Sequence, residues 1–158
     1  MIAIRGLNHA VLFVSDLARA VDFYQGVLGM RVIVREPRAA FLRASHSDNH
    51  HDLGLFALGP DAPRAPRGHT GLYHLAWQVS TIDDLAAARE VLVSAGAFTG
   101  EASHGATKSV YGADPDGNEF EIVWVLPRED WGSAEFSAPV ERLDLPAELA
   151  RWSGVRTA

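Results

Sequence analysis

Residues 7–32, LNHAVLFVSDLARAVDFYQGVLGMRV, have the pattern of a strand, a helix and a second strand. Residues 72–98, LYHLAWQVSTIDDLAAAREVLVSAGAF, repeat that pattern at an offset of 65 residues, so that His9 matches His74. An internal repeat of this kind indicates two modules that are built alike. The same elements are therefore expected after both helices.

The helix of each repeat has its own start and stop signals. In the first, Asp16 stands where an N-cap is expected, and Gly29 supplies a left-handed stop. In the second, Thr81 with Asp84 three residues later has the spacing of a capping box. Apolar residues on one face of each helix predict that it packs on a sheet. They are Leu17, Val21, Tyr24 and Leu28 in the first helix and Leu85, Ala88 and Leu92 in the second.

Three short strand-like runs follow each helix, which predicts the order β-α-β-β-β twice and an α+β fold. The runs are residues 30–36, 39–45, 51–58, 97–102, 108–113 and 118–124. Between the halves, residues 59–71 are rich in Pro and Gly and read as a linker. We therefore predict one domain over residues 1–126, with modules at 4–58 and 72–126, and a C-terminal tail at 127–158.

Composition excludes several classes of protein. The chain has 158 residues, of which 47% are hydrophobic and 22% are charged, as in a globular domain. The net charge is -6 and the Lys and Arg residues are scattered, so no nucleic-acid partner is expected. No apolar run approaches about 18 residues and no signal peptide is recognisable, so we expect a cytoplasmic protein without membrane contact. Without cysteine, a metal would rest on His, Asp or Glu.

One carboxylate stands inside an apolar strand pattern. In residues 111–124, YGADPDGNEFEIVW, Glu121 lies between Phe120 and Ile122 and points to one definite side of the strand. On the solvent side it would need no partner. On the interior side the charge would have to be protonated, paired with a cation or bound to a metal, because an unpaired buried carboxylate is costly.

His9 and His74 occupy equivalent places at the first strands of the two modules. Taken alone, a histidine in a strand is more often a structural residue than a ligand. Two equivalent histidines together with Glu121 are, however, the donor set of the facial triad in non-haem Fe(II) enzymes. That triad leaves coordination positions open for substrate and dioxygen, provided that the three side chains converge.

The paired modules and the quoted stretches resemble the vicinal oxygen chelate superfamily, which contains glyoxalases, bleomycin resistance proteins and extradiol dioxygenases. The resemblance extends over about residues 4–126. It implies that the two modules form an open, cup-like mixed sheet with a metal in the cup. It also implies that His9, His74 and Glu121 hold this metal, which would be Fe2+ or else Mn2+ or another divalent ion.

Within the superfamily, the chain is most similar to the extradiol catechol dioxygenases. Their signature is a His, an apolar residue followed by Tyr, an Asp-Pro turn and a Glu. The matching residues are His104, Val110, Tyr111, Asp114, Pro115, Gly117 and Glu121. Ala102 departs from the pattern, which has Gly, Asn, Thr, Ile or Val at that place. Residues 49–56, NHHDLGLF, resemble the segment that carries an acid–base histidine, which implies this role for His51, the neighbour of His50.

The resemblance implies an Fe(II)-dependent dioxygenase that uses dioxygen to open a catechol-like ring beside its two hydroxyls, as in the degradation of aromatic compounds. His51 would accept and return a proton. His104 and Tyr111 would donate hydrogen bonds to a substrate oxygen.

Two other functions stay open. One is a different metalloenzyme of the superfamily, a glyoxalase-like lyase, isomerase or epimerase. Metal-dependent glyoxalases supply a carboxylate from the last strand of the first module, and residues 53–59 contain none. The other is a small-molecule binding or resistance protein that retains the three donors without turnover.

The C-terminal tail contains Trp131, Phe136 and Trp152, which would be costly to leave exposed together. We expect the tail to pack on the body or on a partner subunit, with a short helix over residues 146–154. Open sheet edges and this aromatic tail also favour a homodimer.

Overall fold

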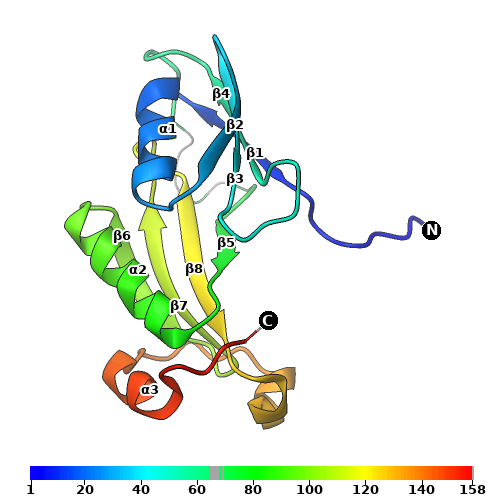
Figure 1. Cartoon of the computed structure of the whole chain (residues 1–158), viewed down its shortest axis with the longest axis vertical. Coiled ribbons are helices and arrows are strands. Elements are labelled where there is room, and N and C mark those ends of the chain that lie inside the picture. The colour runs from blue at the N-terminus through cyan, green and yellow to red at the C-terminus, as the bar shows by residue number, and fades with distance from the viewer. Residues whose placement is uncertain (65–67, 69, 158) are drawn as a thin grey trace. The chain divides into compact units, whose positions relative to one another are not determined.

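The computed structural model describes residues 1–64, 68 and 70–157 of the chain. It divides the chain into two compact units, Met1–His69 and Thr70–Ala158. Each unit contains one four-stranded mixed sheet and the helix that the repeat predicts (Figure 1). None of the described helices has the length and apolar character needed to span a bilayer.

The α+β class and the order β-α-β-β-β are confirmed in both units. The expected linker, residues 59–71, falls partly on residues 65–67 and 69, which lie outside the described residues.

Unit 1 has the sheet order β1-β4-β3-β2, in which β1 and β4 are parallel and the other pairs antiparallel. Its elements are β1 (Ala10–Val14), α1 (Leu17–Gly26), β2 (Arg31–Glu36), β3 (Ala39–Arg43) and β4 (Leu53–Ala57). The N-cap of α1 is the predicted one, because the Asp16 side chain accepts a hydrogen bond from the Arg19 N–H at 3.1 Å. Gly29 has φ +66°, as the predicted left-handed stop requires.

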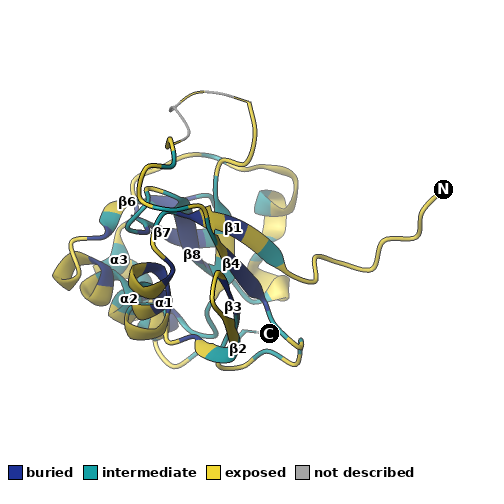
Figure 2. Ribbon diagram, turned by 90° about the horizontal axis from the view of Figure 1, so that it is seen from above, coloured by how far each residue is buried: buried dark blue, intermediate teal, exposed yellow. Residues whose placement is uncertain are grey.

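The sheet of unit 1 has a packed face and an open face. Leu12 and Val14 of β1 are buried, and α1 packs against β2, β3 and β4. The alternate residues Val11 and Phe13 are 50% and 66% exposed. This division follows the period of two in a strand, and Figure 2 shows β1 with both exposed and less exposed residues.

Unit 2 repeats the arrangement with the sheet order β5-β8-β7-β6. Its elements are β5 (Leu75–Gln78), α2 (Ile82–Ser94), β6 (Phe98–Ser103), β7 (Thr107–Ala113) and β8 (Glu119–Val125). The predicted capping box starts α2: the Asp84 N–H donates to Thr81 Oγ1 at 3.0 Å, and the Thr81 N–H donates to Asp84 Oδ2 at 3.1 Å. The fold of the second module thus starts from the signals that the sequence carries.

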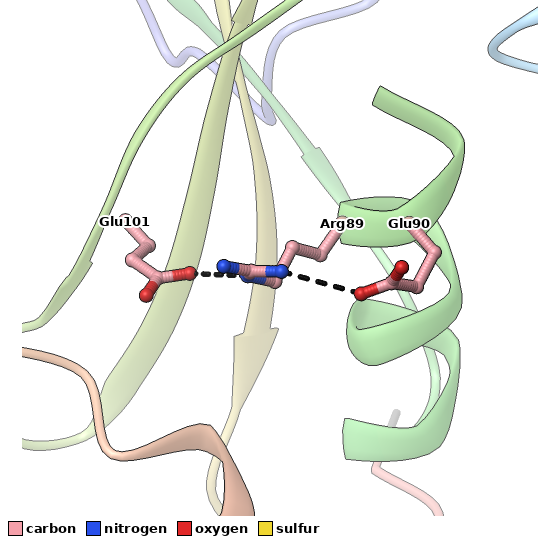
Figure 3. A network of polar contacts seen from close by, with 3 residues as sticks. All are labelled: Arg89, Glu90 and Glu101. Carbon is pink, nitrogen blue, oxygen red and sulfur yellow. Dashed lines mark hydrogen bonds and ion pairs between the residues drawn. The ribbon is translucent and has the colours of Figure 1, made fainter. Parts of the chain in front are cut away.

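An arginine ties α2 to the edge strand β6 (Figure 3). Arg89 Nε donates to Glu101 Oε2 at 2.6 Å, and its Nη1 donates to Glu90 Oε1 at 3.2 Å. The guanidinium also lies 5.3 Å from the centre of the Phe98 ring. The hydrogen bond and the charge of Glu101 raise the pKa of Arg89.

The turn between β7 and β8 is built as predicted, with Asp114 as a turn-forming residue. Asp114 Oδ1 accepts hydrogen bonds from the N–H groups of Asp116, at 2.8 Å, and Asn118, at 2.9 Å. Gly112 is required on β7 because a Cβ there would lie 2.6 Å from Cζ of Phe120. These local features fix the register in which β8 returns beside β7.

The tail forms the 3-10 helices η1 (Arg128–Asp130) and η2 (Gly132–Phe136) and the helix α3 (Leu145–Trp152). The expected short helix is thus confirmed, and it packs on unit 2. Trp152 is 8% exposed, with its ring 6.1 Å from the ring of the fully buried Trp124. After α3, Ser153 Oγ and the Gly154 N–H each donate to Asp83 at 2.7 Å. By contrast, Phe136 is 88% exposed.

We predict that Trp152→Ala lowers the free energy of unfolding by about 3 kcal/mol, because it removes a large side chain from a packed contact. Phe136→Ala is the matched control in the same tail and should change it by less than about 0.5 kcal/mol. Urea denaturation followed by circular dichroism measures both. Equal losses in the two variants would contradict the packing of the tail described above.

In unit 1, Asp52 organises the connection from β3 to β4. This carboxylate is 8% exposed; its Oδ1 accepts from Ser47 Oγ at 2.7 Å and from Asn49 Nδ2 at 2.8 Å, and its Oδ2 accepts from the Ala44 N–H at 2.8 Å. Burial raises the pKa of Asp52, but these hydrogen bonds and the charge of Arg43 together lower it below its ordinary value. The carboxylate is therefore the form that the folded unit prefers.

We expect Asp52→Asn to lower the free energy of unfolding at pH 7 by about 1–3 kcal/mol. Because the folded pKa is depressed, the stabilisation by the wild-type carboxylate is present above the ordinary pKa of 3.8 and is lost as the pH falls through the folded pKa. Urea titrations between about pH 7 and about pH 3 measure the free energy of unfolding of both proteins. The difference in this free energy should become smaller only below pH 3.8. A difference that stays constant over the whole range would contradict this role.

Candidate functional site

The side chain of Glu121 is buried, and His74 is its partner. Strands β5 and β8 are parallel neighbours, and Ala76 lies opposite Glu121. His74, two residues before Ala76, is therefore on the same side of the sheet as Glu121. His74 Nε2 is 3.0 Å from Glu121 Oε2, and Glu121 is 8% exposed. The alternative of a solvent-facing Glu121 is thus ruled out.

The second oxygen of the carboxylate is also engaged. The hydroxyl of Ser109, a fully buried residue of β7, donates a hydrogen bond to Glu121 Oε1. Ser109 is not among the residues predicted from the sequence. A signal was available, because Ser109 and Tyr111 are two residues apart in a strand and so share one face.

His74 keeps one unused polar atom. Its Nδ1 is buried and has no hydrogen-bond partner among the residues that the structure describes. A buried polar atom of this kind is costly and is often a sign of function or of a missing ligand.

Tyr111 and His104 extend the cluster on the same face. Tyr111 lies opposite Glu121 in the register of β7 and β8, and its ring is 5.8 Å from that of His74. His104, in the turn between β6 and β7, places its Nε2 2.8 Å from the Tyr111 hydroxyl. Burial and then the charge of Glu121 raise the pKa of Tyr111, which keeps the hydroxyl protonated. All four residues predicted for the second module therefore lie together.

The two residues predicted for the first module also lie together. The rings of His9 and His51 are 4.5 Å apart, and the ring of Phe41 is 5.0 Å from that of His51. Nδ1 of His50 lies 3.0 Å from Nδ1 of His51. Burial and the neighbouring His9 and His50 lower the pKa of His51, against an opposing effect of Asp52, so the neutral imidazole is favoured.

The geometry of His74 and Glu121 fits two adjacent ligands of one metal ion. Bonds of about 2.0–2.2 Å from a metal to nitrogen and oxygen, at a right angle, put the two donor atoms about 3.0 Å apart. The observed separation between Nε2 and Oε2 is 3.0 Å. The hydrogen bond from Ser109 orients the Glu121 carboxylate, and outer partners of this kind orient the ligands in metal sites.

Within the part of the chain that the structure describes, no three or more His, Asp and Glu side chains gather as a group that could hold a metal ion. The pair His74 and Glu121 belongs to unit 2, whereas His9 belongs to unit 1. The complete triad therefore stays a prediction.

Known proteins provide a second line of observation. Residues 6–122 match the family model of the glyoxalase/bleomycin resistance protein/dioxygenase superfamily. A catechol-2,3-dioxygenase of Bacillus subtilis (strain 168) is 32% identical over 126 residues, which are 79% of this chain and 43% of that protein. The metallothiol transferase FosB of Lysinibacillus sphaericus (strain C3-41) is 27% identical over 127 residues, 75% of this chain and 82% of that protein.

A solved structure agrees with the fold. The crystal structure of a glyoxylase/bleomycin resistance protein/dioxygenase domain from Frankia sp. EAN1pec has a TM-score of 0.65 to this chain at 23% identity. The match covers 78% of this chain and 99% of the Frankia chain. The chain also spans less than half the length of the Bacillus dioxygenase. The sequence resemblance is thereby confirmed: this chain belongs to the glyoxalase/bleomycin resistance protein/dioxygenase superfamily, also called the vicinal oxygen chelate superfamily.

Proposed function

We propose that the chain is an Fe(II)-dependent extradiol-type dioxygenase that opens a catechol-like ring beside its two hydroxyls. The observation that carries the proposal is the separation of 3.0 Å between His74 Nε2 and Glu121 Oε2, with the ring of Tyr111 next to that of His74. The similarity to the Bacillus catechol-2,3-dioxygenase supports the same class of chemistry. Because the chain spans only 43% of that relative, the whole activity belongs to the proposal.

The proposed metal ligands are His9, His74 and Glu121. The donor atoms, two imidazole nitrogens and a carboxylate oxygen, suit Fe2+ and also Mn2+. When bound, the metal would supply a positive charge that favours ionisation of a substrate hydroxyl and a centre at which dioxygen reacts.

The remaining residues of the cluster act on the substrate and its protons. Ser109 holds the carboxylate of Glu121 in one orientation through its hydrogen bond to Oε1. Tyr111 and His104 form a hydrogen-bonded pair that would position a substrate oxygen. His51, in the first module, would accept the proton that leaves a substrate hydroxyl and return it later. The homodimer and the cytoplasmic location expected from the sequence stay predictions.

Similarity to the metallothiol transferase FosB supports a second candidate, a metal-dependent transferase or lyase that acts on a small molecule without dioxygen. FosB is 27% identical to this chain over 127 residues. The same ligands would serve, because a metal-bound substrate can be activated without redox chemistry.

We expect the protein, purified without oxygen and supplied with Fe2+, to consume dioxygen when it is offered catechols ranging from plain catechol to biaryl diols. A yellow ring-opened product should form in equimolar amount. An oxygen electrode and an absorption spectrometer measure the two quantities together. If iron binds but no catechol consumes dioxygen, the second candidate replaces the first; if no divalent metal binds, both are wrong.

We predict that Glu121→Gln weakens Fe2+ binding by at least about 100-fold, because it removes the charged ligand at nearly constant size. Ser109→Ala should weaken it by about tenfold, since it frees the orientation of the carboxylate. Anaerobic calorimetric titration measures the affinities, independently of activity.

The matched control for both variants is Glu101→Gln, which removes another paired carboxylate of unit 2. Glu101 is bound to Arg89 and is assigned no part in the site. This variant should bind Fe2+ as the wild type does. Equal affinities of all three variants would contradict the assignment of Glu121 as a ligand.

A further inference from the structure

Both ring nitrogens of His104 have a partner, and the two partners differ in chemistry. Nδ1 lies 2.8 Å from the carbonyl oxygen of Pro139, and Nε2 lies 2.8 Å from the hydroxyl of Tyr111. A carbonyl oxygen only accepts, so Nδ1 must carry the hydrogen. In the neutral imidazole Nε2 is then an acceptor, and the proton between the two side chains comes from Tyr111.

Pro139 belongs to the tail, which follows the residues 6–122 that match the family. Its position is set by a two-way backbone pairing next to it. The Glu141 N–H donates to the Ser103 carbonyl at 3.0 Å, and the Ser103 N–H donates to the Glu141 carbonyl at 2.9 Å. The tail thereby adds a short bridge beside the end of β6, one residue before His104.

A buried lysine holds the tail on the same part of the sheet. Lys108 is 7% exposed, and its Nζ donates to Ser103 Oγ at 2.9 Å and lies 2.9 Å from Glu148 Oε1 of α3. Breaking such a pair would leave a buried charge without its partner, which is strongly unfavourable. The end of β6, the start of β7 and the tail are thus joined at one point.

The tail also lies close to the turn that carries His104. Gly105 has φ +77°, and a Cβ at this position would lie 3.0 Å from Cβ of Ala134 and 3.7 Å from Pro139. A side chain at residue 105 would therefore press on Ala134 of the tail. The turn that carries His104 and the tail are thus closely packed.

We propose that the tail acts as a positioning element: the Pro139 carbonyl fixes the tautomer of His104, which commits the proton of Tyr111 to His104 and leaves the Tyr111 oxygen as an acceptor. The consequence for the ligand rests on the function proposed above. The group of the substrate that meets Tyr111 is then one that still carries its hydrogen, such as a hydroxyl. This assignment differs from the expectation that Tyr111 and His104 both donate to the substrate.

The test is a long-range proton–nitrogen spectrum of the full chain labelled with nitrogen-15 in histidine. The spectra are recorded at a pH of about 8.5, where histidine side chains of model peptides are neutral. The coupling pattern then shows which ring nitrogen carries the hydrogen. His104→Gln identifies the signals by their loss. The wild type should show His104 with its hydrogen on Nδ1. Hydrogen on Nε2 in the wild type overturns the proposal without any variant having to fold.

The contribution of the tail is tested with Glu141→Pro, which removes the N–H that donates to Ser103. The matched control Glu141→Gln keeps this N–H and changes only the side chain. Circular dichroism checks that both fold. His104 should become a mixture of tautomers in Glu141→Pro and keep Nδ1–H in Glu141→Gln. An unchanged tautomer in folded Glu141→Pro overturns the role of the tail.

Turnover separates this inference from the proposed function. With a catechol that the wild type consumes, Glu141→Pro should lower kcat/KM about tenfold relative to Glu141→Gln, the effect of one misdirected hydrogen bond. Equal kcat/KM values despite a changed tautomer overturn the link to the substrate. If the wild type consumes no catechol, the proposed function fails, whereas the spectra still decide the tautomer.

Discussion

A buried carboxylate is the constraint on which the polar cluster of unit 2 depends. Glu121 stands in the middle of an apolar strand, and removing an ionised carboxylate from water is costly unless its oxygens are satisfied. His74 meets one oxygen and Ser109 the other. The strands beside β8 must therefore keep the register that brings His74 and Ser109 to Glu121.

The same register places the polar side chains and the packed apolar side chains on opposite faces of the sheet. On one face of β8 and its neighbours lie the polar groups of the cluster, while Trp124, on the opposite side of the strand, is fully buried near Trp152 of α3. A shift of one residue would exchange the two faces. The tight approach of Phe120 to Gly112 and the turn at Asp114 oppose such a shift, so local packing preserves the position of Glu121.

The tail packs on the sheet of unit 2 and also contacts the polar cluster. Trp152 of α3 packs near Trp124 on the packed face of the sheet. Glu148 of the same helix forms an ion pair with the buried Lys108 and so supplies this charge with a partner. Between the described 3-10 helices and α3, the tail passes the turn that holds His104 and presents the Pro139 carbonyl to it. A segment outside the repeat thus reaches the polar cluster through one backbone atom.

Several features of the protein depend only on neighbours along the chain and can be predicted from one sequence. They are the strand alternation, the caps at Asp16 and Thr81, the two modules and the family signature around Tyr111. These features follow from local geometry, so a single sequence carries them. The burial of Glu121, its hydrogen bond from Ser109 and the contact of Pro139 with His104 are visible only in the folded protein. Such contacts join residues on different elements, and they depend on strand register and on the path of the tail, which no local pattern encodes.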